Sequence, residues 1–147
     1  MANIKRIQKE LSMIESNKDK QFIIKYNGDE LFNLIAYIDG PVDTPYQGGV
    51  FKVDITLPSN YPFAAPECIV KTQIYHPNVS DNGNICLNVL KQWKPSITIK
   101  EVVENIISLL VSPNPDDSLS ANIGQQYINN YDKFVQTARE YTSKYAH

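Results

Sequence analysis

Three features that define large classes of protein are scarce in this sequence: cysteine, long apolar runs and an excess of basic residues. Only two of the 147 residues are cysteine, so a disulfide scaffold is excluded. No apolar run approaches the roughly 18 residues of a membrane span, and residues 1–13 carry charges where a signal peptide has an apolar run. The formal net charge of -2 argues against a general binder of nucleic acid or acidic membranes. We therefore expect a soluble cytoplasmic or nuclear protein with neither partner.

The sequence also lacks the segments that divide chains into domains. It contains no linker, low-complexity stretch or internal repeat, and hydrophobic residues make up 42 % of it, enough for one core. We expect a single domain over residues 1–147. The possible zinc ligands Cys68, His76, Cys86 and His147 lack the paired short spacings of zinc sites, so no metal is expected.

Apolar residues recur with the period of a helix near the N-terminus and with the period of a strand farther along. From about residue 3 to 16 they fall at steps of three and four, which predicts a helix with one core-facing stripe. Residues 49–57 alternate apolar and polar side chains, as a half-buried strand does. Short connectors rich in turn residues favour antiparallel pairing. The expected strands are 22–26, 31–38, 49–57 and about 67–72, which together make a meander sheet.

Helices fill the C-terminal third of the sequence. Thr98, followed three places later by Glu101, forms a capping box before a run with a broad apolar face. The segment 113–117 ends that helix, and two shorter helices are expected at about 119–129 and 131–145. An N-terminal helix, a four-stranded antiparallel meander sheet, a long active-site loop and C-terminal helices define an α+β fold.

The segment from 74 to 97 has no convincing periodicity, and a structureless run of that length in a compact domain is usually functional. Pro77 stiffens its start, and the turn-forming residues that follow favour a tight turn that brings Cys86 near Asn78. A carboxamide beside a thioester can donate hydrogen bonds to a developing oxyanion, worth about 2.7 to 4 kcal/mol per donor. The residues alone leave three interpretations open: a nucleophilic Cys86, a cysteine hydrolase that also uses His76, and a buried structural cysteine.

Six motifs resemble those of the ubiquitin-conjugating enzymes in type, spacing and order, over about residues 4 to 146. The most specific is HPN at 76–78, which seven residues separate from Cys86 in the motif ICL. The likeness is greatest to the small members that consist of the catalytic domain alone. The other motifs are TPYQGGVF at 44–51, YPFAAP at 61–66, QWKPSITI at 92–99, SLLVSPNPDD at 108–117 and REYTSKYA at 139–146.

The resemblance implies a transferase centred on Cys86. In this family the cysteine accepts ubiquitin from an activating enzyme as a thioester and passes it to a lysine, or to the cysteine of a ligase. Asn78 falls on the asparagine assigned to oxyanion stabilisation or to holding the active-site loop, and Asp117 on an acidic residue that orients the incoming lysine. Asn88 stands where many relatives have aspartate or serine. The resemblance places His76 and Pro77 in the active-site loop, with a structural role for the histidine, and Asn114 and Leu119 in the gate segment.

The resemblance further implies a monomer whose partners are ubiquitin, the ubiquitin-activating enzyme and RING or HECT ligases. It implies no cofactor, because the activating enzyme uses the ATP. The residues that match partner surfaces are Lys5, Arg6 and Lys9, expected on the solvated face of the first helix, and Phe63, Pro95 and Ser96 in two ligase-binding loops. The residue type alone predicts burial for Phe63, and the resemblance reverses that expectation.

Two alternatives to ubiquitin conjugation stay open. One is the same chemistry on another ubiquitin-like modifier, although the basic first helix and the PFAAP and KPS segments fit ubiquitin better. The other is a non-catalytic ubiquitin-binding variant of the fold, but such variants lack the cysteine that this sequence keeps.

Overall fold

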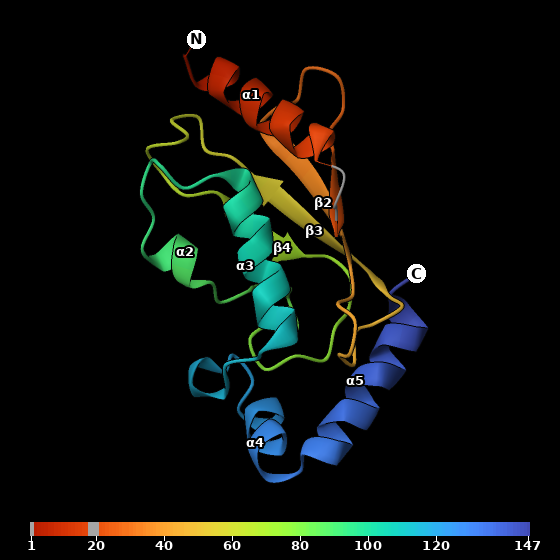
Figure 1. Cartoon of the computed structure of the whole chain (residues 1–147). Helices are drawn as coiled ribbons and strands as arrows, with labels where there is room; N and C mark the ends of the chain where they lie inside the picture. The colour runs from red at the N-terminus through yellow and green to blue at the C-terminus, as the bar shows by residue number, and fades with distance from the viewer. Residues whose placement is uncertain (1, 18–20) are drawn as a thin grey trace.

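Four strands form one antiparallel sheet whose order in space is the order in the sequence (Figure 1). The computed structural model describes residues 2–17 and 21–147. The predicted four-stranded meander is confirmed. Its strands are β1 (Phe22–Lys25), β2 (Asn33–Asp39), β3 (Val50–Thr56) and β4 (Glu67–Val70).

The register of the sheet gathers the apolar residues of all four strands on one face. Ala36 in β2 lies opposite Val53 in β3, which in turn lies opposite Val70 in β4. Because side chains alternate between faces, the neighbours two residues away point to the same side. The buried strand residues on this face are Phe22, Leu34, Ala36, Ile38, Phe51, Val53, Ile55, Cys68 and Val70.

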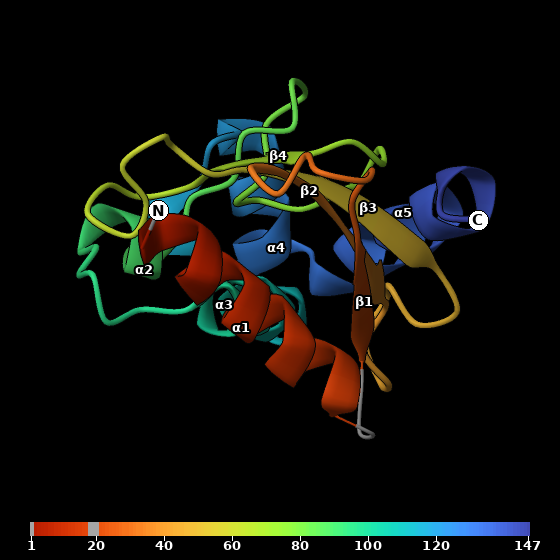
Figure 2. The same cartoon turned by 90° about the horizontal axis from the view of Figure 1, so that it is seen from above.

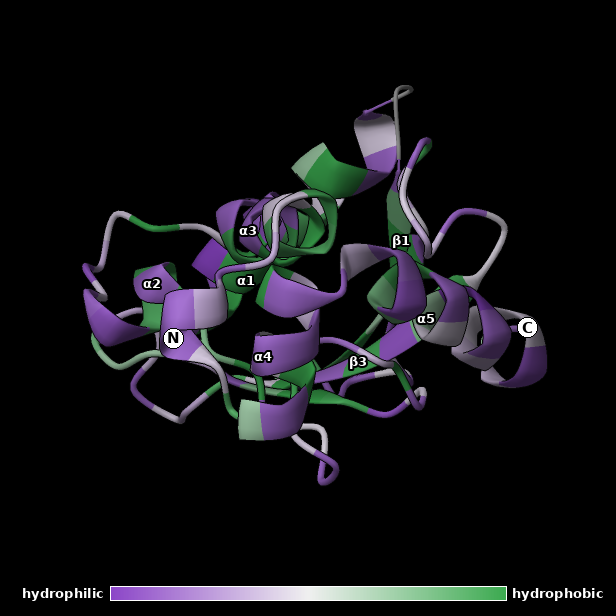
Figure 3. Ribbon diagram, turned by 90° about the horizontal axis from the view of Figure 1, so that it is seen from below, coloured by the Kyte–Doolittle hydropathy of each residue, from purple (hydrophilic) through white to green (hydrophobic). Residues whose placement is uncertain are grey.

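Helices α1 (Ala2–Ser16) and α3 (Ile99–Val111) cover the buried face of the sheet (Figures 1 and 2). The predicted stripe of α1 is confirmed, since Ile7, Leu11 and Ile14 are all buried. Thr98 caps α3 by accepting a hydrogen bond from the Glu101 backbone N–H, as its sequence predicts. In Figure 3 hydrophobic residues gather in the middle of the molecule, and α4 and α5 carry mainly hydrophilic turns on their outer sides.

The C-terminal helices are α4 (Ala121–Asn129) and α5 (Tyr131–Tyr145). The first of them starts two residues later than predicted. Ser120 is its N-cap, and the Leu119 backbone N–H is already bonded to the Pro77 carbonyl at 2.8 Å. Within the described residues, no helix has the length and apolar character that crossing a membrane requires.

Two departures from the predicted elements have local causes. Strand β4 ends at Val70, because the Lys52 N–H on the neighbouring strand donates to the Thr72 hydroxyl at 2.9 Å rather than to a backbone carbonyl. The segment 74–97 is also not wholly irregular, since it contains the one-turn helix α2 (Asn88–Lys91). Four residues are too few to show a helical period, so the sequence gives no sign of α2.

Candidate active site

The loop before α2 folds back on itself and brings Asn78 and Cys86 face to face. The Cys86 N–H donates to the Asn78 carbonyl at 3.1 Å, and Val79 and Ile85 form an isolated antiparallel bridge just beyond them. The predicted return of the thiol toward Asn78 is therefore confirmed. It comes from backbone pairing, so the main chain fixes the position of the cysteine.

Gly83 makes this return possible. Its φ of +85° lies in the left-handed region that glycine adopts readily, and its N–H closes the turn onto the Ser80 carbonyl at 2.9 Å. Its carbonyl accepts from the Val70 N–H at 2.8 Å, which attaches the turn to the sheet. A Cβ at this position would collide with the Val70 carbonyl oxygen, so no larger residue fits.

The two cysteines occupy opposite environments. Cys86 is partly exposed and lies between Leu87, which is buried, and Ile85, which is partly buried against the core. The interpretation of Cys86 as a buried structural residue is therefore wrong, because only its neighbours are seated in the core. Cys68 is 6 % exposed, and burial raises the pKa of its thiol to about 12. An inert structural cysteine is what such burial produces.

The side chain of Asn78 joins the cysteine loop to the segment after α3. It is 1 % exposed, and its Oδ1 accepts from the Asn114 N–H at 2.8 Å. Its Nδ2 donates to two carbonyls, that of Asn114 at 2.7 Å and that of Asp117 at 3.2 Å. Both amide hydrogens are thus engaged, and this geometry supports the loop-holding role. The oxyanion role stays a prediction, and it requires one of these bonds to be exchanged.

The segment that carries Asp117 is fixed by its own residues as well. Residues Pro115–Asp117 form the short helix η1, which Asn114 caps by accepting from the Asp116 N–H. The Asn114 Nδ2 donates to the Asp117 carboxylate at 3.2 Å, and Leu119 is tied to the Pro77 carbonyl. The gate residues are therefore bonded to the cysteine loop, and the Asp117 carboxylate has a defined position beside it.

A hollow of about 260 Å³ lies where the cysteine loop, η1 and α3 meet. Cys86, Asn88, Asn114 and Asp117 line it, as the predicted site requires. The lining residues that the sequence does not single out come from α3 and its C-cap: Asn105, Ser108, Leu109 and Ser112. The three polar ones recur at steps of three and four on a helix otherwise rich in apolar residues, and that polar stripe was the available signal.

His76 has no part in proton transfer at the thiol. It is fully buried, its Nε2–H donates to the Leu109 carbonyl at 2.8 Å, and its Nδ1 accepts from the Asn78 N–H at 2.9 Å. Both ring nitrogens are therefore engaged by the backbone, which fixes the neutral tautomer. Burial lowers the pKa of the imidazole from 6.5 to about 4. The hydrolase interpretation fails for want of a base, and the structural role implied by the resemblance is supported.

The buried His76 predicts a loss of stability in mild acid. In the unfolded chain the imidazole takes up a proton below pH 6.5, whereas in the folded protein it stays neutral down to about pH 4. The unfolded state then binds more protons, so the free energy of unfolding falls as the pH drops through this window, by up to about 3 kcal/mol. Urea unfolding between pH 7 and pH 4 measures the fall. An NMR titration of the His76 ring in the folded protein tests whether this histidine causes the fall. A titration midpoint near pH 6.5 would contradict that explanation.

The possible zinc ligands do not come together. Cys68 is buried under the sheet, and His76 is engaged by backbone groups on both nitrogens. Across residues 2–17 and 21–147, no three His, Cys, Asp or Glu side chains are placed to hold a metal ion.

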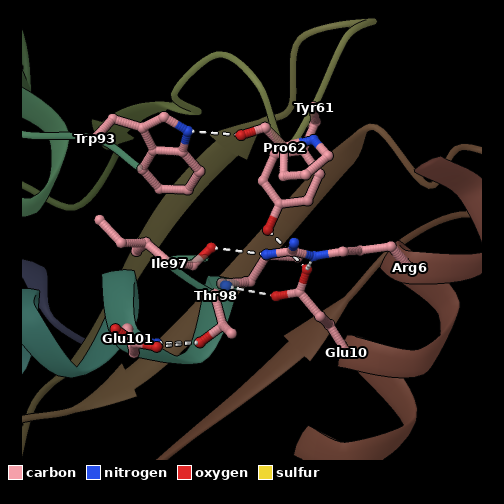
Figure 4. A network of polar contacts seen from close by, with 9 residues as sticks. Arg6, Glu10, Tyr61, Pro62, Trp93, Ile97, Thr98 and Glu101 are labelled. Atoms are coloured by element: carbon pink, nitrogen blue, oxygen red, sulfur yellow. Dashed lines mark hydrogen bonds and ion pairs between the residues drawn. The ribbon is translucent and has the colours of Figure 1, made fainter. Parts of the chain in front are cut away.

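A buried carboxylate on α1 connects this helix to the loop between β3 and β4 and to the start of α3 (Figure 4). The Glu10 side chain accepts from the Tyr61 hydroxyl and the Ile99 N–H, both at 2.7 Å, and from the Arg6 Nε at 3.0 Å. Burial and the bond to Glu10 raise the pKa of Tyr61. Arg6 also donates to the Ile97 carbonyl at 3.0 Å. The prediction that Arg6 lies on the solvated face is therefore wrong: its guanidinium is half-buried in this network.

Replacing Glu10 by alanine is expected to lower the free energy of unfolding by about 2 to 4 kcal/mol. The change leaves the Tyr61 hydroxyl and the Ile99 N–H without their acceptor and removes the counterion of Arg6. Glu15→Ala is the matched control, since Glu15 is exposed on the same helix and its loss is expected to change stability by less than about 0.5 kcal/mol. Urea unfolding of both variants provides the comparison, and equal small losses would contradict the role of the network.

The other residues matched to partner surfaces are accessible. Lys5, Lys9, Pro95 and Ser96 are exposed, and Phe63 is 76 % exposed. The burial expected from residue type is wrong for Phe63, because Tyr61 takes the buried place under the loop. The two loops lie side by side, since the Trp93 Nε1–H donates to the Pro62 carbonyl at 2.8 Å (Figure 4).

Comparison with known proteins agrees with this geometry. A family model described as "Ubiquitin-conjugating enzyme" matches residues 6–142, so the chain belongs to the ubiquitin-conjugating enzyme family. It is similar in structure to a protein from Plasmodium yoelii provisionally identified as a ubiquitin-conjugating enzyme, with a TM-score of 0.93 and 36 % identity over 99 % of this chain and 96 % of that one. A ubiquitin-conjugating enzyme domain from Toxoplasma gondii is also similar, with a TM-score of 0.91 and 36 % identity over 98 % and 99 % of the two chains.

Proposed function

We propose that this protein accepts ubiquitin from the activating enzyme as a thioester on Cys86 and transfers it to a substrate lysine. The observation that carries the proposal is the contrast between the two thiols. Cys86 is accessible at the rim of a hollow that also holds Asp117 and Asn114, whereas Cys68 is buried under the sheet. Of the two thiols, only that of Cys86 is accessible for exchange with another protein's thioester.

Charging is a thiol exchange. The Cys86 thiolate attacks the carbonyl carbon of ubiquitin's C-terminal glycine, a new C–S bond forms, and the thiolate of the activating enzyme leaves. In the second step a neutral lysine amine attacks the same carbon, a C–N bond forms, the C–S bond breaks, and Cys86 leaves as a thiolate. The proton that the nitrogen loses passes to water. In this proposal the Asp117 carboxylate orients that lysine, and its hydrogen bond from the Asn114 side chain supports the assignment.

The partner surfaces complete the proposal. Lys5 and Lys9 contribute to binding of the activating enzyme, and Phe63, Pro95 and Ser96 to binding of a RING ligase or of a HECT ligase that takes the ubiquitin onto its own cysteine. The accessibility of these five residues supports this assignment. We further propose a monomer in the cytoplasm or nucleus that binds no cofactor, because ATP is consumed by the activating enzyme.

Incubation with ubiquitin, activating enzyme and ATP tests the proposal. The expected product carries one ubiquitin, requires ATP, and is split by a thiol reductant. Prior treatment with iodoacetamide should label Cys86 alone and abolish the product, since Cys68 is buried. No reductant-sensitive product with ubiquitin would refute the proposal. A product formed only with another ubiquitin-like modifier and its own activating enzyme would favour that alternative.

A further inference from the structure

Arg6 is the basic residue of α1 that the proposed function leaves without a role. Its sequence neighbours Lys5 and Lys9 are exposed, as a charged contact with a partner requires. The side chain of Arg6 is only 30 % exposed, and its guanidinium is turned toward the rest of the molecule. The groups that it bonds therefore indicate what it does.

The guanidinium of Arg6 donates in two directions at once (Figure 4). Its Nε–H bonds to the Glu10 carboxylate and its Nη2 bonds to the Ile97 carbonyl, both at 3.0 Å. Its central carbon lies 5.6 Å from the centre of the Tyr61 ring, within the range of a cation–π interaction. The planar fork of an arginine places donors at both acceptors, whereas a lysine ammonium is a single point.

The carbonyl that Arg6 holds belongs to the turn with two of the residues assigned to ligase binding. Pro95 and Ser96 are exposed in this turn, and the Ile97 N–H closes it onto the Lys94 carbonyl at 3.0 Å. The last residue of the turn is therefore bonded to α1 through its carbonyl. Arg6 fixes the turn on the side that faces the helix.

The partner of Arg6 in the ion pair reaches the second ligase-binding loop. Glu10 accepts from the Tyr61 hydroxyl and from the Ile99 N–H, both at 2.7 Å. Tyr61 is fully buried, and two residues later Phe63 is 76 % exposed. The pair of Arg6 and Glu10 thus joins α1 to both loops, so the exposed side chains of the two loops share one bonded base.

We propose that Arg6 is a positioning residue for RING ligase binding: it holds the turn 94–97 at the spacing from Phe63 at which one ligase domain contacts both loops. This inference rests on the proposed function, because it requires a RING ligase to bind these loops. A ligase that meets an ordered surface loses no binding energy to ordering it. The active-site hollow, which α3 reaches only with residues 105–112, should keep its geometry when Arg6 is changed.

Arg6→Lys tests this role, because it keeps the charge and removes the fork. Trp93 is the only tryptophan in the chain, and its Nε1–H donates to the Pro62 carbonyl at 2.8 Å, so its fluorescence reports how the two loops lie against each other. In the variant we expect Trp93 emission at longer wavelength and faster quenching by acrylamide. Arg139→Lys is the matched control and should match the wild type, since Arg139 is exposed on α5, at the opposite end of the molecule from the two loops (Figures 1 and 2).

The second readout is discharge of the ubiquitin-charged protein to free lysine, stimulated by the most active of a panel of purified RING domains. Arg6→Lys should raise the KM for the RING domain about tenfold, the factor expected when one hydrogen bond from a charged group is lost. The kcat at saturating RING domain should stay within about twofold of the wild type. Charging by the activating enzyme should keep its rate, because Lys5 and Lys9 are unchanged.

The outcomes separate a positioning role from two others. A raised KM with unchanged Trp93 fluorescence would assign Arg6 to direct contact with the ligase and overturn the inference. An unchanged KM, whether Trp93 fluorescence changes or not, would leave Arg6 with a structural role at most and would also overturn it, as would a change confined to kcat. Failure of the wild type to charge would overturn the proposed function itself. A charged wild type that no RING domain stimulates would overturn the ligase-binding part of that function, and this inference with it.

Discussion

Replacing Asn78 by alanine is expected to lower the free energy of unfolding by about 2 to 4 kcal/mol and to slow transfer to lysine more than charging. The buried carboxamide makes three hydrogen bonds to the backbone of Asn114 and Asp117, and the variant leaves those groups unpaired. Asp117 then loses its fixed position. In the proposed reaction Asp117 acts in lysine transfer, whereas charging requires only the Cys86 thiol.

Urea unfolding and single-turnover rates of charging and discharge measure these effects, and amide hydrogen exchange of residues 113–119 reports the order of the η1 segment. Asn122→Ala, at an exposed position on α4, is the control and should match the wild type. Faster exchange together with slower discharge supports the loop-holding role. A slower discharge with unchanged stability and exchange would instead assign Asn78 to the oxyanion. Equal losses in charging and discharge would show that the whole cysteine loop had been disturbed.

Local patterns in the sequence predicted the elements of this fold well. The alternation in β3, the stripe of α1 and the cap at Thr98 each depend on near neighbours, and each is confirmed. The limits of elements depend on side chains from elsewhere. Strand β4 ends where the Thr72 hydroxyl replaces a ladder carbonyl, and α4 starts after Leu119 has bonded to Pro77.

The candidate site was predicted only in part, because it is built across long sequence separations. The turn residues before Cys86 predict its return to Asn78, but the residues alone could not choose between a nucleophile and a structural thiol. The family motifs favour the nucleophile, and the partial exposure of Cys86 in the structure supports that interpretation. The Lys91 ammonium lies 3.8 Å from the Asp117 carboxylate, and this pair joins α2, a single turn without a period, to η1, which belongs to a distant part of the sequence. Nothing in the sequence indicates that they meet.

The orientation of Arg6 shows the same limit. Its place on the polar side of α1 predicts solvent exposure, but its partners come from α1 itself and from the loop before α3. A long side chain at the edge of a helix face can turn inward when a buried carboxylate is available. The sequence shows Glu10 four residues from Arg6, yet only the structure shows that this carboxylate is buried.

Replacing Cys86 by serine or alanine has the largest effect expected for any single change. A serine at this position can form an oxygen ester with ubiquitin, slowly, because a hydroxyl is a much weaker nucleophile than a thiolate. An alanine can form no bond at all. Cys68→Ser, by contrast, should leave charging intact, since that side chain is buried in the core and out of reach of another protein's thioester.

The mass of the charged Cys86→Ser variant tests the central claim most directly. The account predicts the addition of one ubiquitin through a bond that thiol reductants leave intact and hydroxylamine cleaves, with no adduct on Cys86→Ala. A reductant-sensitive adduct that persists in either Cys86 variant would contradict the account, because the thioester would then lie on another cysteine.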